Sequence, residues 1–125
     1  MDLPRPESVI ERFSELLARR DLDAMVELYE PDAAFAPQPG HSVTGHEEIK
    51  AALQGFLAVK PRMEGRIEKV LEAGDTALVT NRWRLTGTAP DGSPVRMEAT
   101  SADVLRRRPD GSWGIVIDDP WGATS

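Results

Sequence analysis

The stretch that decides the fold is one strand-like run, Val95-Arg96-Met97-Glu98-Ala99-Thr100-Ser101-Ala102-Asp103-Val104-Leu105-Arg106. Side chains alternate between the two faces of a strand. One face therefore carries Val95, Met97, Ala99, Ser101, Asp103 and Leu105, and the other carries Arg96, Glu98, Thr100 and Arg106. A carboxylate on an apolar face is costly to bury unless it is protonated or has partners. Asp103 is therefore the first candidate for a functional residue.

Three further strand-like runs flank this one. Together the expected strands cover Gly65–Ala73, Ala77–Thr88, Val95–Arg106 and Ser112–Asp119. Gly74-Asp75 separates the first two, and the tetrapeptide Pro-Asp-Gly-Ser occurs twice, at residues 90–93 and 109–112. Asp-Gly between strand-like runs is a strong signal for a hairpin. The second half of the chain therefore predicts an antiparallel meander of four strands.

The first half of the chain has helical periodicity instead. Apolar residues at three- and four-residue spacing predict helices over residues 6–20 and 22–29, and a third helix that opens after Thr44 and ends before Pro61. Thr44 and Glu47 have the spacing of a capping box. Residues 33–36 predict a short strand before the third helix. Helices followed by a meander indicate an α+β fold, with about three N-terminal helices on one sheet face, in a single domain over residues 1–125.

Composition narrows the class of protein. The 125 residues include 21 acidic and 15 basic side chains, a formal net charge of -6, which argues against a nucleic-acid or anionic-membrane partner. The only basic run, residues 106–108, is interpreted as a solvated strand end. The chain has no cysteine, starts without the pattern of a signal peptide and has no apolar stretch of membrane-spanning length. We therefore expect a cytoplasmic protein.

Several short motifs give the chain a family resemblance. They are Leu28-Tyr29-Glu30-Pro31-Asp32-Ala33, Gly45-His46-Glu47-Glu48-Ile49, and Asp103-Val104-Leu105-Arg106-Arg107 followed by Asp110-Gly111-Ser112-Trp113. With them the chain resembles, over nearly its whole length, the family of nuclear transport factor 2, ketosteroid isomerase and the SnoaL-type polyketide cyclases. The resemblance implies a cystatin-like roll, in which a strongly curved sheet wraps around the helices as a cone with an apolar pocket, and a homodimer through the outer sheet face. The family hosts isomerases, cyclases, dehydratases, hydrolases and binding modules, so the fold does not fix the reaction.

The resemblance also gives Asp103 a role. Asp103 matches the aspartic acid that ketosteroid isomerases keep neutral in an apolar site, where it donates a hydrogen bond to a developing enolate. The alternative is a structural carboxylate bonded to a neighbouring Trp or Asn. Two other parts of the isomerase pattern are missing, because residues 35–39 lack the expected carboxylate and the first helix presents Phe13 where that family has a tyrosine. Steroid isomerase activity itself is therefore not expected.

Asp119 is the second candidate acid. The last strand gives one parity to Trp113, Ile115, Ile117 and Asp119. Asp119 is thus expected at the open end of an apolar face, where SnoaL-like cyclases place an acid/base residue. A slip of one residue would substitute Asp118, and a solvated strand end is the other alternative. If Asp103 and Asp119 face one cavity, their repulsion raises one pKa, so that one serves as acid and the other as base.

The expected walls of the cavity are mostly aromatic. The predicted ligand-binding residues are Phe13, Tyr29, Phe35, Phe56, Met63, Asn81, Trp83, Met97 and Trp121. Asn81 would orient a ligand carbonyl or satisfy a neighbour in the sheet, and Tyr29 would offer its hydroxyl or be an ordinary core residue. Trp121 would close the pocket mouth or contact a second copy. His41 and His46 are the only histidines, and no histidine-carboxylate cluster has metal-ligand spacing, so we expect neither a metal nor another cofactor.

These observations lead to two hypotheses about function. The first is a SnoaL-like protein that binds an apolar, polycyclic small molecule and moves a proton next to its carbonyl, giving isomerisation or ring closure, with Asp103 as acid and Asp119 as base. The second is a non-catalytic ligand-binding or dimerisation module of the same fold. Epoxide hydrolysis ranks lower, because it needs an Asp-Arg-Asp relay and both Arg82 and Arg84 have the outward parity of their strand.

Overall fold

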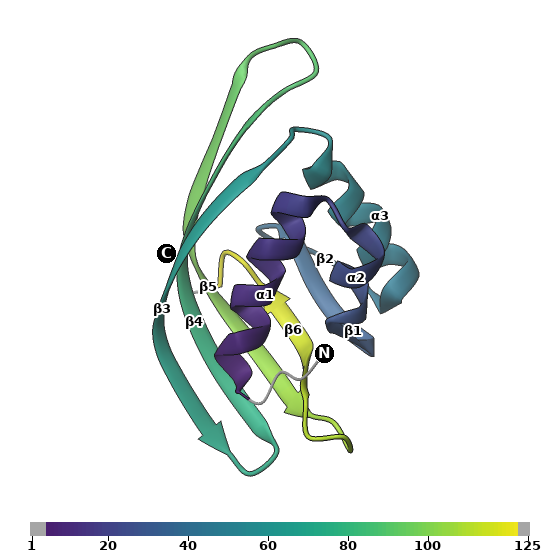
Figure 1. The fold of residues 1–125 in the computed structure, drawn as a ribbon, viewed down its shortest axis with the longest axis vertical. Coiled ribbons are helices and arrows are strands. Elements are labelled where there is room, and N and C mark those ends of the chain that lie inside the picture. Colours follow the sequence, from purple (N-terminus) through teal and green to yellow (C-terminus); the bar gives the residue numbers. More distant parts are fainter. Residues whose placement is uncertain (1–4, 123–125) are drawn as a thin grey trace.

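The protein is described by a computed structural model over residues 5–122. Within them the elements are α1 (Pro6–Arg19), α2 (Leu22–Glu27), β1 (Tyr29–Gln38), β2 (His41–Thr44), α3 (Gly45–Leu57), β3 (Arg62–Ala73), β4 (Thr76–Thr88), β5 (Pro94–Arg107) and β6 (Trp113–Asp119). The long strands bend around α1, while α2 and α3 pack at the end of the sheet formed by β1 and β2 (Figure 1). The α+β class and the curved sheet are confirmed.

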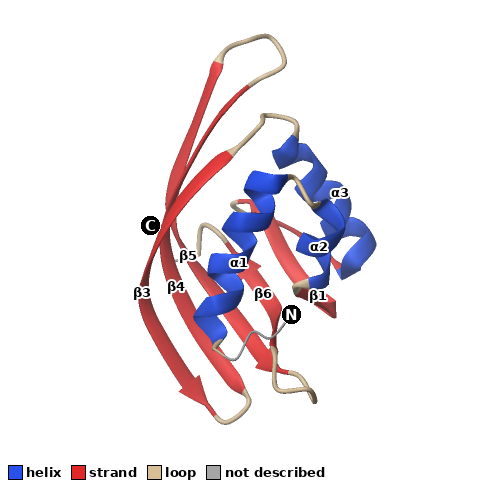
Figure 2. Cartoon of the chain, viewed as in Figure 1, coloured by secondary structure: helices blue, strands red, loops and turns tan. Residues whose placement is uncertain are grey.

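All six strands form one sheet in the order β2-β1-β6-β5-β4-β3. The predicted meander of β3, β4, β5 and β6 is confirmed, and each of its pairs is antiparallel. The pairing of β1 with β6 is parallel, which the sequence did not indicate. This pairing joins the first half of the chain to the last strand, so that the helices, which precede the meander, come to lie inside the bend of the sheet (Figure 2).

The two Pro-Asp-Gly-Ser repeats form the same turn. Oδ1 of Asp91 accepts hydrogen bonds from the amide and hydroxyl of Ser93 at 2.9 and 2.6 Å. Oδ1 of Asp110 accepts the equivalent bonds from Ser112 at 3.0 and 2.6 Å. The glycine of each repeat has φ +88°, a conformation that a residue with a side chain adopts only with strain. Both hairpin predictions are therefore confirmed. The aspartate, glycine and serine of each repeat form the turn themselves.

The segment around the second helix differs from its prediction. That helix ends at Glu27, and Tyr29 opens β1 instead of lying on the helix. β1 is longer than the predicted strand over residues 33–36, and His41 lies in β2, not in a loop. The predicted capping box does not form at α3, because the Thr44 side chain makes no capping bond and Glu48, not Glu47, accepts the Thr44 amide at 2.9 Å. Tertiary pairing with β6 overrides the helical pattern here.

The core lies between α1 and the inner face of the sheet. α1 begins with Pro6, whose missing donor is harmless in the first turn, and ends at Arg20 in a left-handed conformation with φ 56°. It buries one stripe, Val9, Ile10, Leu16 and Leu17, against β3, β4 and β6. This packing places the middle of α1 opposite the inward side chains of β4, β5 and β6, where the candidate residues lie.

Candidate active site

A β-bulge in β6 decides which acid faces the helices. The ladder between β5 and β6 pairs Leu105 with Ile115 but Val104 with Ile117, so that Val116 is one extra residue on β6. A bulge of this kind shifts the alternation of side chains by one position. Ile115 is buried in consequence, whereas Ile117 is 45 % exposed.

The residues after the bulge reverse their predicted directions. Asp118 pairs with Asp103 across the ladder and lines the pocket together with it. Asp119 instead uses its Oδ1 to accept the Trp121 amide at 3.2 Å, in the turn that follows β6. The predicted inward direction of Asp119 is therefore wrong. Asp118, which a slip of one residue would have selected, takes its place.

Asp103 and Asp118, called here the acid pair, are held by hydroxyl donors. Asp103 is only 2 % exposed, and its Oδ2 accepts a bond from the Ser101 hydroxyl at 3.1 Å. The Tyr29 hydroxyl donates to Oδ2 of Asp118 at 2.5 Å. Oδ1 of Asp103 is buried and has no other partner in residues 5–122, and the two carboxyl groups are close enough to shift each other's pKa. A hydrogen bond between them would require one of them to carry a proton.

Burial raises the pKa values of both carboxyl groups of the acid pair. Burial first, and then the charge of Asp118, raise the pKa of Asp103 well above its ordinary range. Burial also raises the pKa of Asp118, but hydrogen bonds from Asp103 and Tyr29 oppose this rise. Burial and the charge of Asp118 raise the pKa of Tyr29 well above its usual value, so that it stays a donor. Both pKa values are raised, that of Asp103 the more strongly, so that the pair as a whole keeps a proton at a pH where an ordinary aspartate has lost it.

The acid pair lies at the wall of a mostly apolar, partly enclosed pocket with a free volume of about 60 Å³. The described residues that line it are Ile10, Phe13, Ser14, Leu17, Phe35, Leu53, Phe56, Met63, Asn81, Trp83, Leu85, Ser101, Asp103, Ile115, Asp118 and Pro120. None of these is a lysine, arginine or histidine. No positive side chain on the wall therefore offsets the negative charge of the pair.

Aromatic rings fill the end of the pocket beside β1. Tyr29 meets Phe13 and Phe35 edge-on, with ring centroids 6.5 and 6.2 Å apart, and Phe35 lies 6.1 Å from Phe56. Such pairs add about 0.5–1.5 kcal/mol each beyond the area they bury. The hydroxyl at Asp118 thus comes from a tyrosine on β1, held by a ring cluster that includes the Phe13 of α1.

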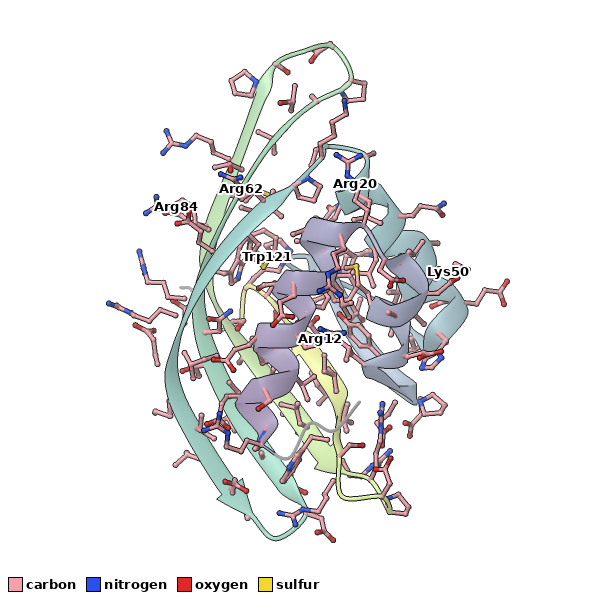
Figure 3. The ribbon with its side chains drawn as sticks, in the orientation of Figure 1. Arg12, Arg20, Lys50, Arg62, Arg84 and Trp121 are labelled. Carbon is pink, nitrogen blue, oxygen red and sulfur yellow. The ribbon has the colours of Figure 1, made fainter. Side chains whose placement is uncertain are left out.

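Most of the predicted lining residues are in place. Phe13, Phe35, Phe56, Met63, Asn81 and Trp83 line the pocket, and Tyr29 is linked to it through its hydroxyl. Met97 is not on the wall, although Leu85, its partner across the ladder, is. Trp121 is not on it either: its ring packs edge-on against Trp83, with centroids 5.2 Å apart (Figure 3). Arg84 projects away from the helices (Figure 3), as its parity predicted.

Sequence reasoning missed two serines of the pocket. Ser101 was placed on the same face as Asp103 but given no role, although it donates to that residue. Ser14 stands four residues after Ile10 and three before Leu17, within the apolar stripe of α1, and this position was the available signal. No sequence pattern indicated that Pro120 lines the pocket, because its position depends on the bulge in β6.

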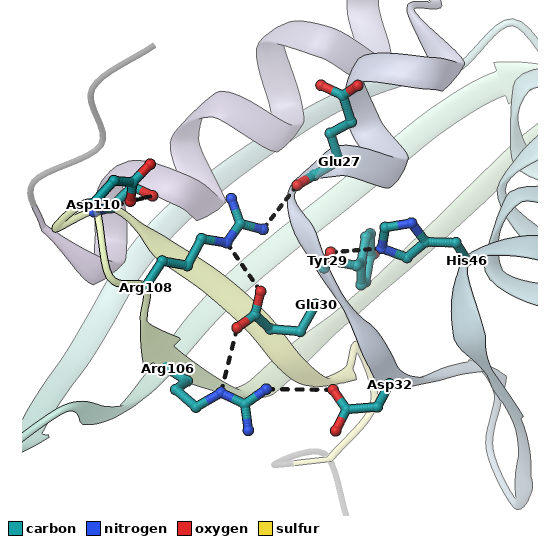
Figure 4. A network of polar contacts seen from close by, with 9 residues as sticks. Glu27, Tyr29, Glu30, Asp32, His46, Arg106, Arg108 and Asp110 are labelled. Carbon is teal, nitrogen blue, oxygen red and sulfur yellow. Dashed lines mark hydrogen bonds and ion pairs between the residues drawn. The ribbon is translucent and has the colours of Figure 1, made fainter.

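A second group of charged side chains lies beside β1, where Arg106 of β5 and Arg108 just after it reach across β6 to Glu30. The ion cluster consists of Glu30, Asp32, Arg106 and Arg108 (Figure 4). Glu30 is 8 % exposed and accepts bonds from Arg106 at 3.3 Å and from Arg108 at 2.9 Å. Arg108 also donates to the carbonyl of Glu27 at 2.9 Å. The interpretation of residues 106–108 as a solvated strand end holds for Arg106 and Arg107, whose side chains are 48 % and 45 % exposed, although Arg106 also binds Glu30. It is wrong for Arg108, which is 27 % exposed and lies beyond the end of β5.

Two further features are absent from residues 5–122. No helix there is long and apolar enough to cross a membrane. No three histidine, aspartate or glutamate side chains of that region gather closely enough to bind a metal ion.

Comparison with known families and structures agrees with the fold. The sequence model of the SnoaL-like domain matches residues 10–114. A ketosteroid isomerase-like protein from Erwinia carotovora superposes with a TM-score of 0.78 at 20 % identity, covering 90 % of this chain and 88 % of that one. A scytalone dehydratase-like protein from Novosphingobium aromaticivorans gives 0.78 at 15 % identity, covering 90 % and 77 %.

A nuclear transport factor 2-like protein of cystatin-like fold, also from Novosphingobium aromaticivorans, has a TM-score of 0.70 at 22 % identity, covering 88 % of this chain and 74 % of that one. At these identities the likeness shows the fold alone. A protein named as a phosphoglucosamine mutase, from Thermococcus gammatolerans, is 29 % identical over 100 residues. This match covers 80 % of the chain but only 22 % of that protein, so the chain spans about a fifth of its length.

Proposed function

The chain belongs to the SnoaL-like domain family, and on that premise we propose that it moves a proton next to the carbonyl of a small apolar molecule. The observation that carries the proposal is the acid pair: two carboxyl groups from paired positions of β5 and β6 meet on an apolar wall that has no cation. Such an arrangement is costly to bury, and it pushes the two pKa values apart, as acid/base chemistry requires.

Asp118 is the base in this proposal. Its carboxylate removes a proton from the carbon next to the carbonyl, and the electron pair of the broken C–H bond becomes the carbon–carbon double bond of an enolate. Where the molecule also has a β,γ double bond, the product is a dienolate, and returning the proton to its γ-carbon isomerises the molecule. A base whose pKa is raised towards the working pH is more effective in such a step, and general base catalysis typically contributes about 10²–10⁴-fold.

Asp103 is the donor acid. In this proposal its proton turns to the carbonyl oxygen as negative charge develops there. A donor in a site of low dielectric is worth about 2.7–4 kcal/mol in comparable oxyanion holes. Tyr29 keeps its bond to Asp118 and fixes the orientation of the base.

The size of the pocket favours a small compound in the conformation described. Typical ligand pockets measure about 300–1,000 Å³, and this one has about 60 Å³. A polycyclic ligand requires the aromatic side chains of the wall, such as Phe13 and Phe56, to move. The same observation favours the second candidate function, a non-catalytic module whose pocket is filled by its own side chains.

The test is exchange of protons for deuterium next to the carbonyl of small cyclic ketones and enones, followed by NMR in heavy water. Wild-type protein should accelerate the exchange, and Asp118→Asn should lower that rate about 10²–10⁴-fold. Asp119→Asn is the matched control, because it makes the same change one residue later and outside the pocket. Exchange that is equally fast in both variants, or absent from the wild type for every compound tried, would contradict a catalytic role.

We also propose a homodimer through the outer sheet face, supported by an aliphatic row that crosses four strands. Leu71 pairs with Leu78, Leu78 with Val104, and Val104 with Ile117. The two ends of this row, Leu71 and Ile117, are 56 % and 45 % exposed. A two-fold axis that runs along the strands between β4 and β5 lays β3 of one copy over β6 of the other. Each exposed end then covers the other end of the row in the second copy.

Sedimentation of the wild type and of Ile117→Glu tests this dimer. The wild type should sediment as a dimer, and the variant as a folded monomer, because a glutamate in the middle of an apolar contact is desolvated without a partner. A monomeric wild type at high concentration, or a variant that still dimerises with unchanged affinity, would rule this face out.

A further inference from the structure

Asn81 carries an acceptor that the protein does not satisfy. The residue is 6 % exposed and lines the pocket, and its Oδ1 has no hydrogen-bond partner among residues 5–122. An unsatisfied buried acceptor destabilises a protein by about 1–3 kcal/mol, and native structures contain few of them. An acceptor of this kind on a pocket wall indicates that a ligand supplies the donor.

Three donors of the pocket region are already used elsewhere. Ser101 stands directly opposite Asn81 across the ladder, but its hydroxyl donates to the main-chain oxygen of Asn81 at 3.2 Å and to the acid pair at 3.1 Å. The indole nitrogen of Trp83 donates to the carbonyl of Pro120 at 2.7 Å. The Tyr29 hydroxyl is bonded to the acid pair. These three donors therefore leave the amide oxygen to the contents of the pocket.

Close packing fixes the position of this amide. A Cβ atom at Gly65 of β3 would lie 2.9 Å from Oδ1 of Asn81 and 3.0 Å from its Nδ2, closer than real contacts allow. The absence of a side chain at residue 65 thus leaves room for the amide beside the main chain of β3. The amide is supported on that side, so a ligand must reach it from the pocket.

The distance between Asn81 and the acid pair limits the shape of the ligand. Asn81 pairs with Ser101, and Asp103 follows two residues later on the same face of β5. Diagonal neighbours of this kind have Cα atoms about 7–8 Å apart, with side chains that both project into the pocket. Two polar groups at opposite ends of one six-membered ring match this spacing. The free volume of about 60 Å³ also favours a single ring.

We propose that the substrate is a monocyclic ketone or enone whose ring carries a hydroxyl group opposite the carbonyl, and that Asn81 accepts the hydrogen bond of that hydroxyl. The proposal rests on the proposed function for the carbonyl end of the ligand. It adds a specificity determinant that acts in binding, and therefore predicts a preference that can be measured without turnover.

The experiment compares the affinities of cyclohex-2-enone and 4-hydroxycyclohex-2-enone, measured by NMR titration of the protein. Wild-type protein should bind the hydroxylated ring at least about fivefold more tightly, since an unsatisfied buried acceptor costs about 1–3 kcal/mol and 1.4 kcal/mol is tenfold. Asn81→Leu has a side chain of similar size but no acceptor. This variant should bind the two rings with affinities that differ by less than about twofold. Met63→Leu is the matched control on the apolar wall, and it should change both affinities alike.

Equal affinity of wild-type protein for the two rings, or a preference that persists in Asn81→Leu, would overturn the proposal. The outcome is independent of catalysis. A hydroxyl preference without any proton exchange would leave this inference standing and remove the proposed function. Exchange that depends on Asp118 but ignores the hydroxyl would do the reverse.

Discussion

The acid pair and the ion cluster solve the same physical problem in opposite ways. Both bury a carboxyl group almost completely, Asp103 at 2 % exposure and Glu30 at 8 %. Both also draw on β1 and β5, and the neighbouring residues Tyr29 and Glu30 of β1 serve one group each. The ion cluster offsets its charge with two arginines, whereas the acid pair has no cation and keeps a proton instead.

This difference separates a carboxylate fixed by cations from the pair to which the proposed function assigns proton transfer. Glu30 holds its charge in place, because Arg106 and Arg108 bind it from two sides and Arg108 also ties it to the end of α2 (Figure 4). The acid pair has no such cation, so that one of its two carboxyl groups stays protonated. Burial of an acid by itself therefore says little about function, and the identity of its partners says much.

Glu30→Gln removes the buried charge of the ion cluster. It should lower the free energy of unfolding more than the matching change in the acid pair does. Breaking a fully buried ion pair costs about 3–5 kcal/mol. Arg106 and Arg108 are 48 % and 27 % exposed, so we expect water to screen part of the loss and the free energy of unfolding to fall by about 2 kcal/mol. Denaturation with urea measures it.

Asp32→Asn is the control for this variant. Asp32 binds the same Arg106 at the same 3.3 Å, but its side chain is 72 % exposed. Its loss should change stability by less than about 1 kcal/mol, as for other surface pairs. Equal effects of the two substitutions would mean that the ion cluster does not stabilise the fold through burial.

The same chemical change in the acid pair, Asp103→Asn, should have a small effect at neutral pH and a clear one on pH dependence. The pKa of Asp103 is raised in the folded protein, so the native state holds a proton that the unfolded chain has already released. Wild-type stability should therefore fall as pH rises from about 4, the ordinary aspartate pKa, through the raised folded pKa, with a slope of at most about 1.4 kcal/mol per pH unit for one group.

Asp103→Asn removes this proton, and the decline of stability with pH should become shallower. At neutral pH the variant should unfold within about 1 kcal/mol of the wild type, because an amide can still donate to Asp118. Thermal unfolding across a series of buffers measures both quantities. A variant whose stability falls with pH as steeply as that of the wild type would show that Asp103 is not the protonated member of the pair.

Much of the fold was readable from local pattern. The repeated Pro-Asp-Gly-Ser turns set the meander, because the aspartate that receives the turn bonds and the glycine that adopts positive φ are both in the motif. The inward direction of Asp103 followed from an alternation that runs unbroken through β5. Tyr29 was placed on a helix instead of a strand, since its pairing partner lies in β6 and the local periodicity contains no trace of it.

By itself the sequence determined the α+β class, the meander and the face on which Asp103 lies, because these depend on preferences that each residue has among its near neighbours. Only the tertiary structure decided that Asp118 and not Asp119 enters the pocket, and that Arg106 and Arg108 bind Glu30. The first depends on the extra residue Val116 in a ladder, and the second on contacts across more than seventy residues of chain. Strand register and distant ion pairs are cooperative properties of the packed sheet, and no local pattern records them.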